Sequence, residues 1–171
     1  RRTTWHDSHC QLTSGPPLRM TATNHALTGA LIGLWSGKPL VAVPAALFSH
    51  FLLDMIPHFG PRMSVVQWLR TQRFRWMLAA DFLGCVTVVI LLFVHKPSHW
   101  LLACFTAFIA TSPDLISYPF FNRAQQDDDA ERFNWYTKFA SRIQWFERPP
   151  GAIVELAWLI GASVLLWQFL R

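Results

Sequence analysis

The chain has 171 residues, of which 52% are hydrophobic and only 15% are charged. Soluble globular domains are about 25% charged, so this composition is poor in charge, and fifteen Lys and Arg against ten Asp and Glu give a formal net charge of +5. The composition excludes a collagen, a coiled coil and a disordered chain, and three cysteines are too few for a disulfide scaffold. The distribution of the apolar residues must therefore decide between a soluble helical bundle and a membrane domain.

Residues 1–19 stand apart from the rest of the chain because they contain no apolar run that could form the core of a signal peptide. Met20, followed by Thr21 and Ala22, reads like a natural start. We interpret residues 1–19 as a disordered leader or an upstream extension. Residues 20–171 are then expected to form a single helical membrane domain.

Five apolar segments follow in chain order, at residues 24–36, 40–56, 76–94, 100–118 and 152–170. The first two are separated by Gly37-Lys38-Pro39 and predict a helical hairpin that either spans the membrane or re-enters it. A helix over 76–94 would be roughly 28 Å long, close to the thickness of a hydrocarbon core. The sequence therefore predicts an all-α integral membrane protein with four to five hydrophobic helices.

The basic residues give this arrangement an orientation. One set of connecting segments contains ten Lys and Arg residues and the opposite set contains three, so the richer side is predicted to be cytoplasmic. On this side, residues 133–146 predict an amphipathic interfacial helix, and residues 64–71 predict a shorter surface helix. Because the basic residues flank membrane segments and form no stripe, nucleic-acid binding is not expected.

Polar side chains inside the apolar segments gather at the predicted cytoplasmic side, where membrane helices commonly place functional groups toward the bundle interior. They are His25, His50, Asp54, Asp81, Asp114 and Glu155, with His58 just beyond the second helix. Small residues share the helix faces of His25 and His50 at four-residue intervals, which allows close helix packing. Gly29, Gly33 and Gly37 follow His25, and Ala42 and Ala46 precede His50. If the hairpin closes along these stripes, His25 is brought beside His50 and Asp54.

Imidazoles and carboxylates are ligands for zinc, manganese and non-haem iron, and a His and an Asp four residues apart on one helix can bind one ion. We expect His25, His50, Asp54 and Asp114 to be metal ligands. A remaining carboxylate would act as a general base on metal-bound water. The candidates for this catalytic role are Glu155, Asp81 and Glu147.

Each of these residues also has a purely structural interpretation. His50 and Asp54 could hydrogen-bond to each other and to neighbouring helices. Asp81 could pair with an interfacial arginine, and Glu155 could neutralise the N-terminus of its own helix. Asp114 follows Pro113 in what could be a helix-ending turn, and His58 follows Pro57 at a boundary where it could be merely interfacial.

Residues 21–60 resemble a family of bacterial inner-membrane proteins described as predicted membrane-bound, metal-dependent hydrolases, the LexA-regulated group. The resemblance lies in Thr23-Asn24-His25-Ala26-Leu27-Thr28-Gly29 and in Ser49-His50-Phe51-Leu52-Leu53-Asp54-Met55-Ile56-Pro57-His58-Phe59-Gly60. The family motif has the form Pro-Asp-x-Asp-His, whereas here the proline precedes the histidine and the second aspartate is absent. The resemblance implies a metal-dependent hydrolase in the bacterial inner membrane.

The leading hypothesis is therefore a membrane-bound metal-dependent hydrolase with a His/Asp site at the cytoplasmic membrane face. Membrane lipids are its expected surroundings, and the basic segments favour an anionic lipid or another phosphate-containing substrate. Two alternatives stay open. The same acids could form the relay of a small transporter or ion pathway, or the protein could be a non-catalytic structural membrane protein.

Overall fold

The computed structural model describes residues 20–60, 65–126 and 149–171, and all the elements in these ranges are helices. They are α1 (Ala22–Ser36), α2 (Pro39–Met55), α3 (Val65–Leu69), α4 (Gln72–His95), α5 (Trp100–Gln126) and α7 (Gly151–Leu170). The predicted all-helical class is confirmed for these residues. The predicted leader 1–19 and interfacial helix 133–146 lie outside the described residues.

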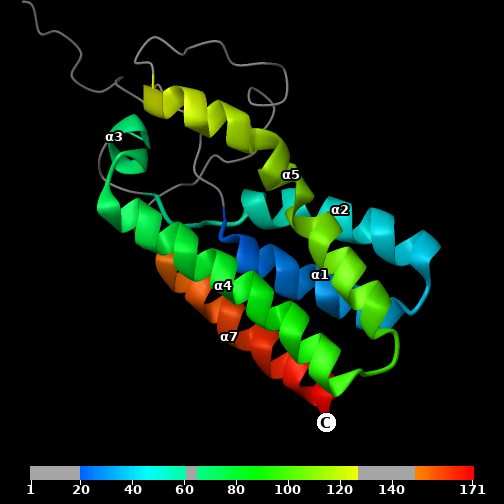
Figure 1. Ribbon diagram of the computed structural model, residues 1–171. Helices are drawn as coiled ribbons and strands as arrows, with labels where there is room; N and C mark the ends of the chain where they lie inside the picture. The colour runs from blue at the N-terminus through cyan, green and yellow to red at the C-terminus, as the bar shows by residue number, and fades with distance from the viewer. Residues whose placement is uncertain (1–19, 61–64, 127–148) are drawn as a thin grey trace, which may run out of the picture.

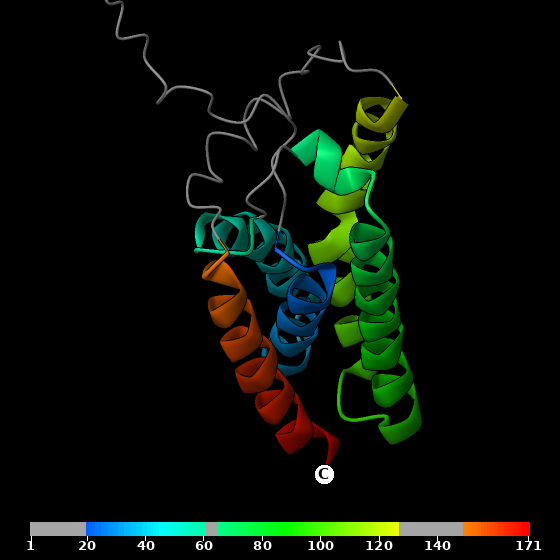
Figure 2. The same ribbon diagram turned by 90° about the vertical axis from the view of Figure 1, so that its left-hand side faces the viewer.

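The short helix α1 occupies the centre of the bundle. It packs against each of the four longer helices, α2, α4, α5 and α7, and its largest interface is with α5. Figures 1 and 2 show α1, in blue, enclosed by these longer helices. Its buried side is made of small and polar residues as well as leucines: Asn24, His25, Ala26, Leu27, Gly29, Ala30, Gly33 and Leu34. A helix too short to cross a bilayer alone is thus the core of the fold.

Two glycines allow the backbone of α1 to pack directly against α5, without side chains between the two helices at these positions. A Cβ atom built on Gly29 would collide with the carbonyl oxygen of Thr106, and one built on Gly33 would collide with the Thr106 hydroxyl. Small residues on α5, including Ala103 and Ala110, complete this contact. The small-residue stripe of α1 was predicted to close the hairpin against α2, but its glycines face α5 instead. Close packing through small residues is typical of membrane helices.

The hairpin of α1 and α2 forms at the predicted turn. Gly37 adopts a left-handed conformation with φ +57°, and its N–H donates to the carbonyl of Gly33. Pro39 then begins α2, where a fixed φ and a missing N–H are well tolerated. The two helices lie in contact. The hairpin therefore brings the start of α1 near the end of α2.

Pro113 does not end the fifth helix. The apolar prediction stopped at residue 118, whereas α5 runs without a break from Trp100 to Gln126. Asp114 accordingly lies within a continuous helix and not in a helix-ending turn. The predicted surface helix at 64–71 corresponds to α3, which is shorter.

Two of the described helices, α4 and α7, are long and apolar enough to cross a membrane. Two others contain shorter apolar stretches, at Pro39–Met55 and Trp100–Ile116. Much of the outer surface of α4 and α7 consists of exposed aromatic and aliphatic side chains, such as Trp76, Phe82 and Ile153. Apolar patches of this extent are unusual on monomeric soluble proteins. Of the four to five hydrophobic helices that the sequence predicts, two thus have the length and apolar composition of a membrane span.

The close packing of α1 on α5 makes a prediction about stability. Gly29→Val should force the two helices apart and reduce the free energy of unfolding by roughly 1–3 kcal/mol, the usual cost of overpacking. Gly161→Val is the matched control because no atom lies within 4 Å of a Cβ built at Gly161. Thermal unfolding in detergent, followed by circular dichroism, should show a lower Tm for the first variant only. Equal Tm values for both variants would contradict the packing account.

Candidate metal centre

The candidate site begins with two side chains of α2, His50 and Asp54. Residues four positions apart lie on one face of a helix, one above the other, and here that face is turned into the protein. His50 is fully buried and the side chain of Asp54 is 2% exposed. The His50 Nε2 atom lies 3.5 Å from Asp54 Oδ2.

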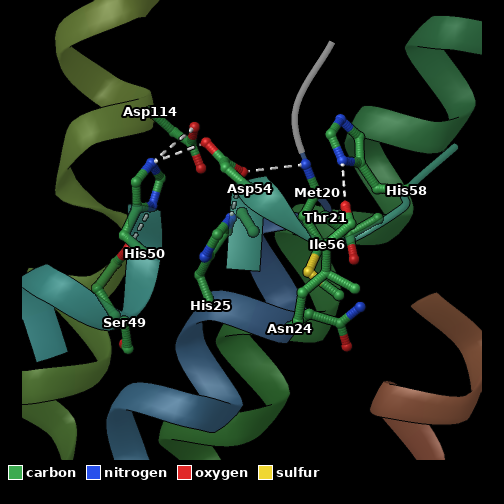
Figure 3. A network of polar contacts seen from close by, with 12 residues as sticks. Met20, Thr21, Asn24, His25, Ser49, His50, Asp54, Ile56, His58 and Asp114 are labelled. Carbon is green, nitrogen blue, oxygen red and sulfur yellow. Dashed lines mark hydrogen bonds and ion pairs between the residues drawn. The ribbon is translucent and has the colours of Figure 1, made fainter. Parts of the chain in front are cut away.

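The third member of the group, His25, comes from the first turns of α1. It is fully buried, and its Nε2 atom lies 3.3 Å from the second carboxylate oxygen of Asp54, Oδ1. Its ring stacks on that of His50 with 4.1 Å between the ring centroids. Figure 3 shows the Asp54 carboxylate above the two imidazoles and close to both. The predicted meeting of His25, His50 and Asp54 is present in the structure.

Helix α5 contributes two groups that determine the chemistry of His50. The backbone carbonyl of Ala110 lies 2.8 Å from His50 Nδ1, and a carbonyl only accepts hydrogen bonds, so this nitrogen carries the proton. In neutral His50 the Nε2 lone pair then points toward acceptors, namely Asp54 and, at 3.9 Å, Oδ1 of Asp114. These groups attract one another only if a cation, either a proton or a metal ion, is shared among them.

The distances within the group fit a metal ion. Nitrogen and oxygen ligands bind zinc at about 2.0–2.2 Å, which places neighbouring ligand atoms of a tetrahedral site roughly 3.4 Å apart. The 3.3 Å separation joins His25 to Oδ1 of Asp54 and the 3.5 Å separation joins His50 to Oδ2, so each histidine faces a different carboxylate oxygen. One ligand atom from each of the three residues lies within 4.8 Å of the others. The other ring nitrogen of His50, Nδ1, donates its N–H to a backbone carbonyl, as metal-binding histidines usually do. The buried His25–His50–Asp54 group could therefore hold a metal ion.

Asp114 lies at the edge of this group. Its side chain is 21% exposed, more than the other three, and its Oδ1 lies 3.9 Å from His50 Nε2. Figure 3 shows Asp114 and Asp54 side by side near the same nitrogen of His50. Of the four predicted ligands, the structure thus gathers three closely and brings the fourth to their periphery.

Asp81, a predicted catalytic residue, faces the beginning of α1. Its two carboxylate oxygens accept hydrogen bonds from the backbone N–H groups of Ala22 and Thr23, each at 2.8 Å. The Thr23 hydroxyl donates to the same carboxylate at 2.6 Å. The first N–H groups of a helix lack partners inside the helix, and Asp81 supplies them from α4. No ion pair joins it to an arginine among the described residues.

Glu155, the other predicted catalytic residue, also binds the backbone. One of its carboxylate oxygens accepts from the N–H of Thr21 at 3.2 Å, and the other accepts from the N–H of Phe59 at 2.8 Å. The structural alternative for Glu155 was to neutralise the N-terminus of its own helix, whereas its oxygens bind the backbone just before α1 and after α2. Glu155 and Asp81 therefore both bind the backbone around the start of α1 and are not members of the His25–His50–Asp54 group. Glu147, the further candidate base, lies outside the described residues.

Two further contacts were not foreseen from the sequence. The backbone N–H of Met20 lies 3.4 Å from Asp54 Oδ1, so this carboxylate also contacts the segment preceding α1. His58, expected to be interfacial, is fully buried, and its Nδ1 donates to the carbonyl of Ile56 at 2.9 Å. Both contacts are visible in Figure 3. The only sequence signal for them was the position of both residues at helix boundaries.

The chain matches no protein-family model, no curated protein and no solved structure.

The position of Asp81 predicts a structural effect for its substitution. Asp81→Ala leaves two N–H groups of α1 without their charged acceptor, so the free energy of unfolding should fall by roughly 1.5–3 kcal/mol. Asp81→Asn keeps one acceptor oxygen and should retain part of this stability. The measurement is thermal unfolding in detergent, with bound metal assayed in parallel and expected to be unchanged. An Asp81→Ala protein of full stability would contradict the capping role and favour the catalytic one.

Proposed function

We propose that this protein is a metal-dependent hydrolase of the bacterial inner membrane, with its metal centre at the cytoplasmic membrane face. The single observation that carries the proposal is the buried group of two stacked imidazoles beside one carboxylate. One ligand atom from each residue lies within 4.8 Å of the others, and His50 is oriented with its Nε2 toward two carboxylates. Two histidines and a carboxylate are a common ligand set of catalytic zinc and non-haem iron sites.

The membrane placement rests on α4 and α7 and on the distribution of basic residues. The candidate centre lies where α2 ends and α1 begins, the same end at which α4 and α7 start. The larger number of Lys and Arg residues at this end supports a cytoplasmic location for it. Burial within apolar helices gives a metal ion a dry environment, in which charge interactions are stronger than in water.

In this proposal His25, His50 and Asp54 are the ligands of a zinc, manganese or iron ion. A bound divalent cation would supply a Lewis acid and lower the pKa of water at the site. Ala110 holds the His50 ring in its tautomer, and Met20 contacts Asp54 through the backbone. Asp114, the most accessible member, is placed either to complete the ligand set or to accept a proton from water. Asp81 and Glu155 are positioning residues, because their oxygens bind the backbone around α1.

Metal content is the first test of the proposal. Full-length protein purified in detergent should contain about one divalent transition-metal ion per chain by plasma mass spectrometry, and the ion should be lost in His50→Ala and in Asp54→Asn. His99→Asn is the control, because His99 is exposed and lies beyond the far end of α4. Its left-handed backbone, with φ 64°, is one that Asn tolerates.

Circular dichroism distinguishes lost metal from lost fold in these variants. A folded His50→Ala protein that keeps its metal would overturn the proposed ligand set. A wild-type protein without stoichiometric metal, even after incubation with zinc or manganese, would overturn the metal centre itself.

Hydrolysis is tested separately with chromogenic phosphate diesters and carboxylic esters as probes. The metal-loaded protein should hydrolyse at least one of these classes, and removal of the metal by a chelator should abolish the rate until metal is restored. Asp114→Asn should reduce kcat by about 10²-fold or more if Asp114 is the general base. Equal rates for the chelated and metal-loaded protein would contradict metal-dependent hydrolysis while leaving the metal site intact.

A further inference from the structure

A second site lies on the other side of the α1 start, between α3, α4 and α7. It is a cavity of about 370 Å³, large enough for part of a small ligand. Its walls are mainly apolar, with Phe59, Trp68, Met77, Leu156 and Leu159 among the lining residues. None of the four candidate metal ligands lines it. The cavity is therefore a separate feature from the candidate metal centre.

Among the described residues that line this cavity, Arg73 is the one with a positive charge. Arg73 is exposed and forms no ion pair within the described part of the chain. Glu155, the acid among these described lining residues, has both carboxylate oxygens engaged by backbone N–H groups. The charge of Glu155 is thus already compensated, and the cavity presents a net positive group to a ligand.

The helix directions reinforce this charge. Arg73 is the second residue of α4 and Ala152, which also lines the cavity, is the second residue of α7. Helix N-termini carry a partial positive charge that favours anions. The first turns of α4 and α7 therefore lie at the same cavity, beside Arg73.

We propose that this cavity binds a membrane lipid with an anionic head group, which Arg73 contacts while the upper part of an acyl chain lies against the apolar wall. The positive charge of Arg73 and the apolar wall together favour this ligand. A small inorganic anion would leave the apolar wall uncovered, and a neutral lipid would leave Arg73 without a counter-charge. The wall continues into the outer surface of α7, where Leu156 is 55% exposed and an acyl chain can extend toward the bilayer. The site goes beyond the proposed hydrolase and does not depend on it.

The test measures binding of defined lipids to full-length protein in detergent by native mass spectrometry. Phosphatidylglycerol should bind at least tenfold more tightly than phosphatidylcholine of the same chain length. Arg73→Gln should weaken phosphatidylglycerol binding at least tenfold and leave phosphatidylcholine unchanged. Ala152→Phe, which fills the cavity, should weaken both lipids.

Arg75→Gln is the matched control, because Arg75 is exposed on the same turn of α4 but does not line the cavity. Equal effects of the two arginine substitutions would overturn the proposal, since they would indicate general attraction to basic surface. Competition by inorganic phosphate that is as strong as competition by the lipid would also overturn it, in favour of a simple anion site. Bound metal should be unchanged in Arg73→Gln, so the two proposals fail independently.

Discussion

The structure depends on how the beginning of α1 is held inside the bundle. Three carboxylates from three different helices accept hydrogen bonds from the backbone there. Asp54 of α2 contacts Met20, Glu155 of α7 binds Thr21, and Asp81 of α4 binds the next two residues. A buried helix N-terminus without acceptors and an isolated buried carboxylate are each costly. Paired in this way, each group satisfies the other, and the positive end of the helix favours the negative charges.

This arrangement explains why few acids are enough to organise an apolar bundle. Contacts at one end of α1 draw α2, α4 and α7 together, while Gly29 and Gly33 allow the backbone of α5 to approach from another side. The approach of α5 in turn places the Ala110 carbonyl against His50. The geometry of the candidate metal centre is therefore a consequence of how the central helix is packed.

The acids within the helices consequently divide by what they contact. Asp81 and Glu155 bind the backbone, Asp114 lies near His50, and Asp54 contacts both histidines and the backbone. All four side chains end in a carboxylate, so only their contacts distinguish a structural acid from a candidate ligand. An acid in a membrane helix is often taken as a sign of function, and here two of the four have a complete structural explanation.

Local patterns were enough to predict the helical class, the positions of the long helices and the meeting of His25 with His50 and Asp54. Helical periodicity and a turn at Gly37 operate over a few residues, and the hairpin joins these side chains directly. The partners of Asp81 and Glu155, the extension of α5 from residue 118 to Gln126 and the burial of His58 were not predictable in this way. They depend on contacts between helices far apart in the chain, where packing selects among many acceptors that are equivalent in sequence. Hydrophobic periodicity carries no information about that choice.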